Sequence, residues 1–529
     1  MQPPCSRTLF ALLCQQAERH PDRIAVISGA RETSYRKLAE RAGRIAAGLQ
    51  AGGIGSGSRV GILIDNRVEW LEAMFGAAAL GAVAVPFSTW SKEAELEFLF
   101  ADAEIDALIA ADRVAGQDFA ATIATLLRQP ERFPQLRTIA ILGAASQPGR
   151  IAYDELLANE PIASDSASPD DDCFTLYTSG SSARPKAVRL CHGSTIENGF
   201  AIGERMRLSP DDRVLLAPPL FWSYGAANAL PATLTHGATL VLQSRFEPGE
   251  WIGLVERHHC TATYTLPSMT GAVLRHAEFR RERVASLRTG LMIGSAGEVR
   301  IAAEELGAAD ICNIYGATET YGNCCVTPCD WPLPRRMVSQ GPPLPGNTLR
   351  IVDAETGAVL AAGEIGLVEV KGHVTPGYAG ASAELNSASF TADGYFRTGD
   401  LGVLDEAGEF HFVGRDSDVI KRAGINVSPA EVEGLLLQHP HVAQAAVVGA
   451  AAGERGEDIV AFVVPHLGDG LDVDVLRAHC RALASSYKVP DRFEICAALP
   501  VTETGKLFRR ALKDRAAAMT ASACGDDSA

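Results

Sequence analysis

The sequence has 529 residues, which is enough for about two to four domains. It is 47% hydrophobic and 21% charged, as in ordinary globular proteins. Its formal net charge of −16 argues against a nucleic-acid-binding protein and against a polybasic membrane anchor, although a local site can still be positive and bind an anion. No stretch approaches the roughly 20 apolar residues of a membrane-spanning helix. We therefore expect a soluble, cytoplasmic protein, and we expect its 12 scattered cysteines to be reduced.

The first part of the chain alternates between helical and strand-like patterns. Residues 36–53 carry apolar side chains at helical spacing and end on glycines, and residues 59–65 are typical of a buried strand. Residues 73–87 predict a buried helix that leads into a strand ending at Pro86. Short apolar strand patterns recur at 212–220, 237–244 and 260–267. This alternation favours an α/β architecture with mostly parallel sheets.

The pattern changes after residue 344. Residues 349–372 and 394–415 indicate strand–turn–strand units, and so a smaller antiparallel module. Beyond residue 414 we predict helices at 428–440 and 472–484, strands at 442–450 and 458–465, and a frayed tail at 516–529. The sequence therefore predicts an N-terminal domain of residues 1–414 and a C-terminal domain of residues 415–529.

One loop suggests phosphate binding. Residues 177–190 read YTSGSSARPKAVRL and contain small hydroxyl residues, a glycine and a lysine, namely Thr178, Ser179, Gly180, Ser181, Ser182 and Lys186. Hydroxyl and backbone N–H groups donate hydrogen bonds to phosphate oxygens, and lysine adds positive charge. Taken alone, the same composition also fits a solvated Ser/Gly turn.

Four further polar stretches follow: NIYGATETYG at 313–322, YFRTGDLG at 395–402, GRDSDVIKRAGINVSPAEVE at 414–433 and PVTETGKLFRR at 500–510. Each is a weak signal alone, but their order and spacing together are specific. With the 177–190 loop, they resemble the AMP-forming acyl-activating superfamily, which includes acyl- and aryl-CoA ligases, adenylation domains and luciferases. The resemblance extends from residue 34 to residue 512, which is nearly the whole chain.

The resemblance implies a fold and a reaction. The expected fold is α/β: a large N-terminal domain of stacked α/β sheets with a β-rich subdomain, followed by a small mobile C-terminal α+β domain. The expected reaction joins ATP and a carboxylate to give acyl-AMP and pyrophosphate, after which a thiol displaces AMP. ATP, Mg²⁺ and coenzyme A are the implied cofactors and co-substrates. Catalysis of the first step should be mostly positioning and charge neutralisation.

The resemblance also implies site residues. Glu319 is similar to the metal-linked carboxylate, Thr318 to a phosphate contact beside it, and Lys506 to the catalytic lysine that reaches the substrate carboxylate and the α-phosphate. Asp400 is suited to the ribose hydroxyls, and Tyr315 to stacking near the adenine. The implied ATP- or AMP-binding residues are Thr178, Ser179, Gly180, Ser181, Ser182, Lys186, Tyr315, Gly316, Asp400 and Arg415.

The C-terminal domain of this family rotates between the two half-reactions. The pivot falls on Ser417, where the family usually has Asp or Lys, and serine is able to absorb the same backbone change. Arg422, Ala423 and Gly424 match the coenzyme A channel. Ala183 and Ala187 stand where the family usually has glycine; because alanine disfavours positive φ, we expect a slightly altered loop and lower affinity for ATP.

The acid pocket corresponds to residues 218–230 and 294–298. These stretches resemble those of benzoate-type CoA ligases, and aromatic walls suit an aryl ring. The implied pocket residues are Trp222, Tyr224, Ala227, Ser295, Ala296 and Gly297. The other interpretation is that Trp222 and Tyr224 belong to the core and carry no information about the substrate. An α-amino acid substrate is disfavoured. Amino-acid-activating domains of this family place an Asp soon after the region that matches residues 218–222, where it pairs with the substrate ammonium, but here the next acidic residue after Asp212 is Glu247.

We therefore expect an aryl-acid:CoA ligase, acting on a benzoate-type acid that includes hydroxy- and aminobenzoates, as a monomer or homodimer. One alternative is a free-standing enzyme that loads an aryl or alkyl acid onto a carrier protein. Another, of a different class, is a non-catalytic nucleotide-binding homologue; a luciferase-like oxygenase is a minor further option. Cys324, Cys325 and Cys329 form the one cysteine cluster, and without a second ligand pair it does not indicate a metal site.

Overall fold

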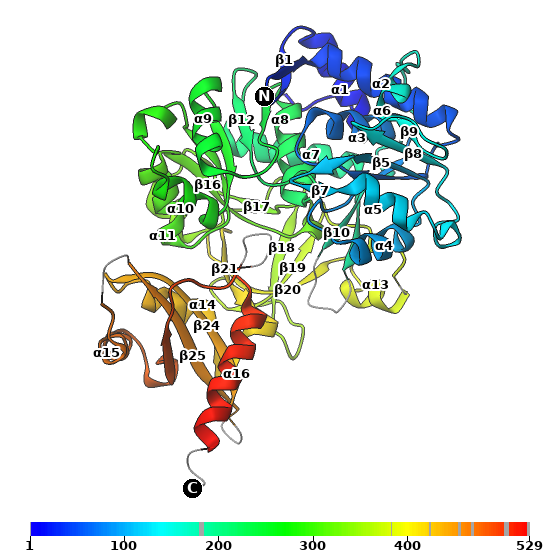
Figure 1. The fold of residues 1–529 in the computed structure, drawn as a ribbon. Coiled ribbons are helices and arrows are strands. Elements are labelled where there is room, and N and C mark those ends of the chain that lie inside the picture. Colours follow the sequence, from blue (N-terminus) through cyan, green and yellow to red (C-terminus); the bar gives the residue numbers. More distant parts are fainter. Residues whose placement is uncertain are drawn as a thin grey trace. The chain divides into compact units, whose positions relative to one another are not determined.

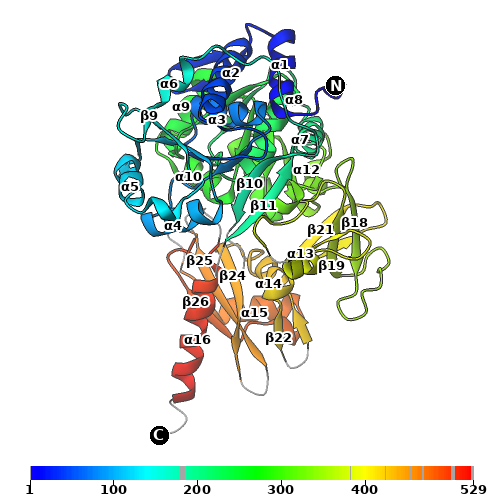
Figure 2. The same ribbon diagram turned by 90° about the vertical axis from the view of Figure 1, so that its right-hand side faces the viewer.

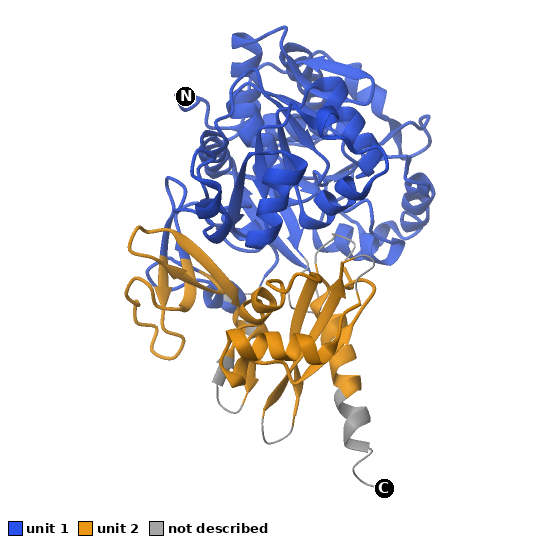
Figure 3. Ribbon diagram, turned by 90° about the vertical axis from the view of Figure 1, so that its left-hand side faces the viewer, with its two compact units in different colours: residues 1–349, 370–396 blue, residues 350–369, 397–529 orange. Residues whose placement is uncertain are grey.

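The computed structural model describes residues 2–178, 185–381, 383–422, 425–452, 456–466, 470–501 and 507–525, with the backbone alone for residues 383, 417, 425, 426 and 520–525. The chain forms two compact units (Figure 3). Unit 1 comprises residues 1–349 and 370–396, and unit 2 comprises residues 350–369 and 397–529. The predicted boundary between residues 414 and 415 differs from this division and stays a prediction.

The first large sheet of unit 1 has eight strands. In order across the sheet they are β17 (Cys325–Val326), β16 (Asp310–Tyr315), β15 (Thr289–Met292), β14 (Ala262–Thr265), β12 (Arg213–Leu216), β13 (Thr239–Leu242), β1 (Ile24–Ser28) and β2 (Arg31–Ser34). The six inner strands are parallel, and the two edge strands pair antiparallel with their neighbours. The strand patterns expected at 212–220, 237–244 and 260–267 are therefore confirmed, and all three lie in this sheet.

The second large sheet has seven strands. In order they are β11 (Lys186–Cys191), β10 (Asp172–Thr178), β4 (Val83–Pro86), β3 (Arg59–Leu63), β5 (Ala107–Ala111), β8 (Thr138–Leu142) and β9 (Ile151–Ala152). The strands from β10 to β9 are parallel, whereas β11 pairs antiparallel with β10 along one edge. A small hairpin of β6 (Arg113–Val114) and β7 (Gln117–Asp118) stands apart from both sheets.

Helices connect these strands. The α-helices of unit 1 are α1 (Leu9–Arg19), α2 (Tyr35–Ala51), α3 (Val68–Ala79), α4 (Glu93–Asp102), α5 (Phe119–Leu126), α6 (Tyr153–Leu157), α7 (His192–Met206), α8 (Leu230–Thr235), α9 (Pro248–His258), α10 (Pro267–Arg275), α11 (Ala296–Ile301), α12 (Leu333–Val338) and α13 (Ala383–Ser389). Short 3₁₀ helices are η1 (Pro130–Arg132), η3 (Arg281–Val284) and η5 (Thr318–Thr320), and π-helical turns are η2 (Tyr224–Ala229) and η4 (Ala302–Leu306).

The core of unit 1 joins the two large sheets. One buried cluster contains Ile62 of β3 and Leu216 of β12, together with apolar residues of α1, α3, α7 and α8. Figure 1 shows α3, α7 and α8 between the strands of the two sheets. Burial on nearly all sides of α3 explains why its sequence is apolar apart from Glu69 and Glu72.

Local signals set the helix ends in this region. The predicted helix at 36–53 is α2; it begins after Ser34, whose Oγ accepts a hydrogen bond from the backbone N–H of Lys37 (3.3 Å), and it ends at Ala51, with Gly52 as its C-cap. The predicted helix–strand unit at 73–87 is α3 followed by β4, which ends at Pro86. No helix in the described parts of the chain is long and apolar enough to cross a bilayer.

Unit 2 contains most of the predicted antiparallel module. Its four-stranded sheet runs β18 (Thr348–Val352), β19 (Gly366–Lys371), β20 (Phe396–Leu404) and β21 (Phe410–Arg415), and β20 pairs antiparallel with β21. The chain continues through η6 (Asp416–Asp418), β22 (Ile420–Arg422), β23 (Ile425–Val427), α14 (Pro429–Leu436), β24 (Val442–Ala451), β25 (Glu457–Pro465), α15 (Val473–Leu483), η8 (Ser486–Lys488), β26 (Arg492–Ile495) and α16 (Arg509–Gly525). The two strands and two helices predicted beyond residue 414 are confirmed.

The expectation of a frayed tail at 516–529 is wrong for residues 516–525, because α16 continues to Gly525. Strands β24, β25 and β26 form a three-stranded sheet with a core on each face. Val447 and Ile459 belong to the cluster that includes residues of α14 and α15, whereas Val460 belongs to the other, with Leu512 and Ala516 of α16. Packing against the sheet therefore stabilises this helix. Its alanine-rich sequence favours a helix, which is a signal that the prediction of a frayed tail overlooked.

Candidate functional site

The hairpin of β10 and β11 carries the ends of the proposed phosphate loop. Thr178 ends β10 and pairs in register with Lys186, the first residue of β11 (Figure 2). The antiparallel register therefore places a hydroxyl residue and a lysine opposite each other at the open end of the hairpin. Ser179, Gly180, Ser181, Ser182 and Ala183 lie outside the described residues.

Ala187 does not adopt the positive φ that alanine disfavours. Ala187 lies within β11 opposite Tyr177, it is buried, and it is not among the described residues with positive φ. Its carbonyl accepts a hydrogen bond from the backbone N–H of Ala379 (2.8 Å). An ordinary strand conformation accommodates alanine, so the expectation of an altered loop has no basis at this position.

Tyr378 contacts two of the predicted residues, and sequence reasoning missed it. Its hydroxyl donates a hydrogen bond to Glu319 Oε1 (3.0 Å), and the Lys186 Nζ atom lies 5.0 Å from the centre of its ring. Burial, together with the Glu319 carboxylate, raises the pKa of Tyr378, so its hydroxyl remains a donor. The available signal was the sequence VTPGYAG, which places an aromatic residue directly after a Pro-Gly turn.

Glu319 and Thr318 lie in the short helix η5, just after β16. Glu319 is half-buried, and among the described residues its second oxygen, Oε2, has no hydrogen-bond partner. An oxygen ligand that is accessible and not already hydrogen-bonded fits the preference of Mg²⁺ for hard donors. The Thr318 hydroxyl donates to Ser223 Oγ (3.0 Å), so the Thr-Glu pair is in direct contact with the stretch expected to line the acid pocket.

Tyr315 and Gly316 follow at the end of β16. Tyr315 is buried, and Gly316 approaches the backbone so closely that an added Cβ would lie 2.5 Å from Asn323 Cα. Two buried amides here were missed: Asn313 Nδ2 and both polar side-chain atoms of Asn323 have no hydrogen-bond partner in the described part of the chain. Buried polar groups are normally paired, so these atoms are candidates for contact with a polar ligand. Asn313 stands inside the NIYG motif, which was the available signal.

Phe221 and Trp222 of the acid-pocket stretch form an aromatic cluster with Trp90, and these three residues define the cluster. Trp90 packs edge-to-face against both others, with ring centres 5.3 Å apart in each case. Phe221 and Trp222 lie 6.1 Å apart at 88°. Trp222 is half-buried, which leaves part of its ring available for a ligand. Phe221 lies within residues 218–230, but Trp90, from a distant loop, gave no sequence signal.

The other predicted pocket residues differ in exposure. The Tyr224 hydroxyl donates to the Leu291 carbonyl (2.8 Å), and its ring packs against Tyr264, which is evidence for a core anchor. Ala227 is fully buried. Ser295 caps α11, where its Oγ accepts from the backbone N–H of Glu298, and Ser295 and Gly297 are exposed while Ala296 is half-buried. Space is open around Gly297, where an added Cβ would meet no atom within 4 Å.

Unit 2 brings together two of the predicted nucleotide residues. Asp400 of β20 and Arg415 of β21 are register partners, and Arg415 Nε lies 3.3 Å from Asp400 Oδ1. The Asp400 side chain is 8% exposed and that of Arg415 is 60% exposed. The carboxylate is therefore held by the sheet, and the guanidinium extends toward solvent within this unit.

The remaining predicted residues also belong to unit 2. Ser417 lies in η6, and its side chain is not described. The Arg422 guanidinium donates to Asp491 Oδ1 (2.5 Å) and to the carbonyls of Tyr487 and Val489 (3.0 and 3.1 Å), which are structural contacts of unit 2. Its assignment to a coenzyme A channel stays a prediction. Ala423, Gly424 and Lys506 lie outside the described residues.

Comparison with known proteins decides the family. The AMP-binding enzyme model matches residues 13–379, and the AMP-binding enzyme C-terminal domain model matches residues 431–506. The chain belongs to the AMP-binding enzyme family. The resemblance expected from the sequence is thus confirmed, as is the α/β fold with a large N-terminal domain of parallel sheets and a small C-terminal domain.

Relatives in this family are similar over nearly the whole chain. Feruloyl-CoA synthase from an Amycolatopsis species is 32% identical over 510 residues, covering 95% of this chain and 97% of that protein. Sulfoacetate–CoA ligase from Cupriavidus necator is 29% identical over 524 residues, covering 97% and 99%. The crystal structure of anthranilate CoA ligase AuaEII in complex with anthranoyl-AMP has a TM-score of 0.86 at 26% identity, covering 98% and 99%.

Membership of this family, together with the similarity to CoA ligases over nearly the whole chain, establishes the class of reaction. The chain is an AMP-forming acid–thiol ligase of the acyl-CoA synthetase type, with ATP and coenzyme A as substrates. The alternative of a non-catalytic nucleotide-binding homologue is accordingly set aside. The relatives are named for chemically different acids, so the acid itself is a separate question.

Proposed function

We propose that this AMP-binding enzyme is an aryl-acid:CoA ligase that activates a benzoate-type acid and transfers the acyl group to coenzyme A. The observation that carries the proposal is the aromatic cluster of Trp90, Phe221 and Trp222, with part of the Trp222 ring accessible. Edge-to-face aromatic packing suits an aryl substrate better than a small charged one. The names of feruloyl-CoA synthase and anthranilate CoA ligase among the relatives give further support.

The polar residues Thr178, Lys186 and Glu319 support a binding site for the triphosphate. We assign Lys186 and Thr178 to the β- and γ-phosphates, and Glu319 to Mg²⁺ through its oxygen Oε2. When bound, Mg²⁺ would offset the phosphate charge and orient the triphosphate. The contact from Thr318 to Ser223 (3.0 Å) joins the nucleotide side of this group to the acid side, which is consistent with attack of the carboxylate on the α-phosphate.

In unit 2 we assign Asp400 to the ribose hydroxyls, since a carboxylate accepts two hydrogen bonds from a diol. Its fixed position beside Arg415 supports this assignment. We further propose that a C-terminal domain from about residue 415 rotates about Ser417 between the half-reactions. Lys506 then neutralises charge on the substrate carboxylate and the α-phosphate during adenylation.

The first test is mass spectrometry of the products formed from ATP, Mg²⁺ and a panel of acids, with and without coenzyme A. The panel holds benzoate, hydroxy- and aminobenzoates, cinnamates, alkanoates and sulfoacetate. We expect an aryl-CoA that forms when coenzyme A is present. Products from alkyl acids or sulfoacetate alone would refute the aryl assignment. An acyl-AMP that accumulates even with coenzyme A would indicate a carrier-protein acceptor instead.

Two substitutions of the half-buried ring sharpen this test. Trp222→Leu should raise KM for the aryl acid about tenfold, because it removes ring contacts worth roughly 1 kcal/mol or more. Trp222→Phe should cost less, and KM for ATP should stay the same in both. Trp331→Leu is the matched control, because Trp331 is also half-buried and stacks with Arg335 (3.6 Å), and no ring contact in the described part of the chain joins it to the aromatic cluster. Equal effects of Trp222→Leu and Trp331→Leu would argue against a ring-binding surface.

The lysine has its own test. Lys506→Ala should lower the rate of adenylation at least about 100-fold, since a charge that stabilises the transition state is worth several kcal/mol. Thioester formation from supplied acyl-AMP and coenzyme A should be nearly unchanged. Equal loss of both half-reactions would refute the assignment of Lys506 to the first step.

A further inference from the structure

Tyr378 is one residue that contacts two separate parts of the proposed ATP site. Its hydroxyl donates to Glu319 Oε1 (3.0 Å), and its ring faces the Lys186 ammonium at 5.0 Å. Lys186 begins the edge strand β11, whereas Glu319 follows β16 of the other large sheet. No ion pair among the described residues joins Lys186 directly to Glu319. Each charge therefore contacts a different part of one neutral side chain.

The backbone around Tyr378 is held firmly. The Tyr378 N–H donates to Asn386 Oδ1 (2.9 Å), and the next N–H, of Ala379, donates to the Ala187 carbonyl (2.8 Å). Before it, Gly377 has φ of 130°, and an added Cβ would lie 2.7 Å from Asn386 Oδ1. Tyr378 is buried, with 5% of the residue's surface exposed. These contacts fix the ring and its hydroxyl in place, so the tyrosine is able to orient what it touches.

The two contacts have different chemical consequences. The hydroxyl occupies one carboxylate oxygen of Glu319 and leaves Oε2 for a cation, which selects one orientation of the carboxylate. The ring attracts the Lys186 ammonium through its π-face. A direct Lys186–Glu319 pair would neutralise both groups and would compete with phosphate and Mg²⁺ for them. The tyrosine satisfies each charge only in part.

We propose that Tyr378 is a positioning residue for ATP and Mg²⁺: its hydroxyl orients Glu319 for the cation, and its ring keeps Lys186 available for phosphate. This inference rests on the roles proposed above for Glu319 and Lys186. It concerns nucleotide binding and does not depend on which acid the enzyme uses. The two contacts are separable, because phenylalanine keeps the ring and loses the hydroxyl, whereas leucine loses both.

The experiment measures nucleotide binding by calorimetry without any acid, with full-length protein, at a series of Mg²⁺ concentrations. Tyr378→Phe should raise the half-saturating Mg²⁺ concentration for ATP binding about tenfold, since it removes a hydrogen bond to a charged group. Its affinity for ATP in EDTA should match that of the wild type. Tyr378→Leu should show the same Mg²⁺ effect and, in addition, bind ATP in EDTA about fivefold more weakly.

Tyr35→Phe is the matched control. Tyr35 is also a buried tyrosine of unit 1, and its hydroxyl donates to the Ala238 carbonyl (2.6 Å), so this variant loses one hydrogen bond without touching Lys186 or Glu319. A Mg²⁺ dependence of Tyr378→Phe equal to that of Tyr35→Phe would overturn the proposal while the ligase assignment stood. If Glu319→Gln bound ATP with the wild-type dependence on Mg²⁺, the underlying site assignment would fail and the proposal with it.

Discussion

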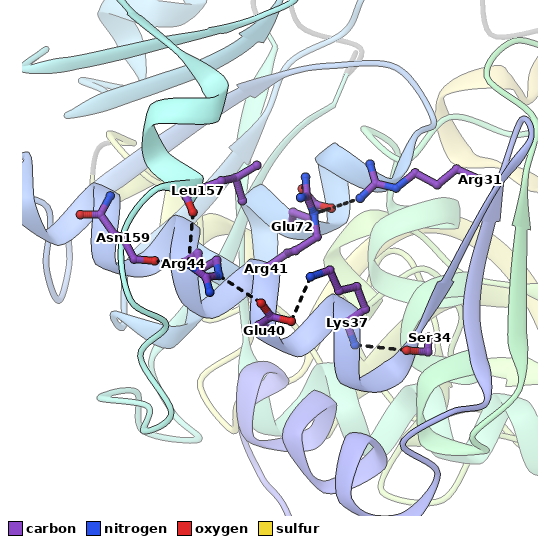
Figure 4. A network of polar contacts seen from close by, with 9 residues as sticks. All are labelled: Arg31, Ser34, Lys37, Glu40, Arg41, Arg44, Glu72, Leu157 and Asn159. Atoms are coloured by element: carbon purple, nitrogen blue, oxygen red, sulfur yellow. Dashed lines mark hydrogen bonds and ion pairs between the residues drawn. The ribbon is translucent and has the colours of Figure 1, made fainter.

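Two carboxylates of unit 1 show opposite ways of placing a charge inside a protein. Glu72 on α3 is fully buried, and its oxygens accept hydrogen bonds from Arg31 (3.0 Å), Arg41 (2.5 and 3.0 Å) and Tyr153 (2.7 Å). Figure 4 shows the two arginines converging on Glu72. Glu319, by contrast, is half-buried and accepts one side-chain hydrogen bond, from Tyr378, among the described residues.

The difference distinguishes a structural charge from one that is available to a ligand. Burying an ion is costly unless partners and hydrogen bonds satisfy it, and Glu72 has them in full. Its contacts connect β2, α2, α3 and α6, so they specify how these elements pack. One carboxylate oxygen of Glu319 has no hydrogen-bond partner among the described residues. The free-energy cost of burying this charge is limited, because the side chain is partly solvated. Buried charge alone therefore does not indicate a functional site; a partly exposed carboxylate oxygen without a hydrogen-bond partner, as in Glu319, is the better candidate.

The largest expected effect belongs to Glu72. Glu72→Gln should lower the free energy of unfolding by about 3 kcal/mol, because two arginines lose their buried carboxylate partner. Denaturant unfolding followed by tryptophan fluorescence measures this. KM for ATP should not change. Glu69→Gln, which affects one contact to Arg31 (2.8 Å), should cost less than about 1 kcal/mol and serves as the control. Equal losses of unfolding free energy in Glu72→Gln and Glu69→Gln would show that the number of hydrogen-bond partners of the carboxylate does not determine its contribution to stability.

Glu319 should show the reverse behaviour. Glu319→Gln should lower kcat/KM for adenylation about 100-fold, or roughly 3 kcal/mol of transition-state stabilisation, because the oxygen offered to the cation becomes an amide. Its unfolding free energy should stay within about 0.5 kcal/mol of the wild type. Pyrophosphate release measures the first quantity. A variant that is fully active but destabilised would place Glu319 with Glu72, as a structural residue.

A third buried group tests the rule that a charge needs a partner. His192 is fully buried, its Nδ1 accepts from the backbone N–H of Leu9 (3.2 Å), and its Nε2 has no hydrogen-bond partner among the described residues. Burial lowers its pKa from 6.5 to about 4. The folded state thus binds its proton less readily than the unfolded state, and stability falls as pH falls from about 6.5 toward 4.

Between pH 7 and pH 5 this histidine should remove about 2 kcal/mol of stability. His192→Asn retains an acceptor for Leu9 but does not titrate, so its unfolding free energy should depend less on pH by that amount. Denaturant unfolding at the two pH values, for both proteins, measures the difference. An identical pH dependence of wild type and variant would mean that the folded protein accommodates the imidazolium.

Much of the fold and part of the site were predictable from the sequence. The strands, α2 and the β20–β21 hairpin follow from period and turn residues, which act locally. The full extent of α16 was not predicted, because the contacts of its buried residues Leu512 and Ala516 with the sheet are visible only in the folded structure. Motif residues such as Glu319 were recognisable by spacing. Tyr378 and Trp90 were not, because they act through contacts with segments far away in sequence.

The smallest expected effect lies on the surface of α2, beside the buried network (Figure 4). Glu40 contacts Lys37 (3.0 Å) and Arg44 (3.2 Å), and hydrogen bonding to Lys37 lowers the pKa of Glu40. These side chains are 27–54% exposed, so water and salt screen the pairs.

Lys37→Ala should change the unfolding free energy by no more than about 0.5 kcal/mol, and less at high salt. A double-mutant cycle with Glu40→Ala isolates the coupling between the two side chains at low and high ionic strength. A coupling as large as that of Glu72 would mean that exposure does not set the strength of these pairs. A small, salt-dependent coupling would show that the same residue types on adjacent helices differ in effect because one carboxylate is desolvated and the other is not.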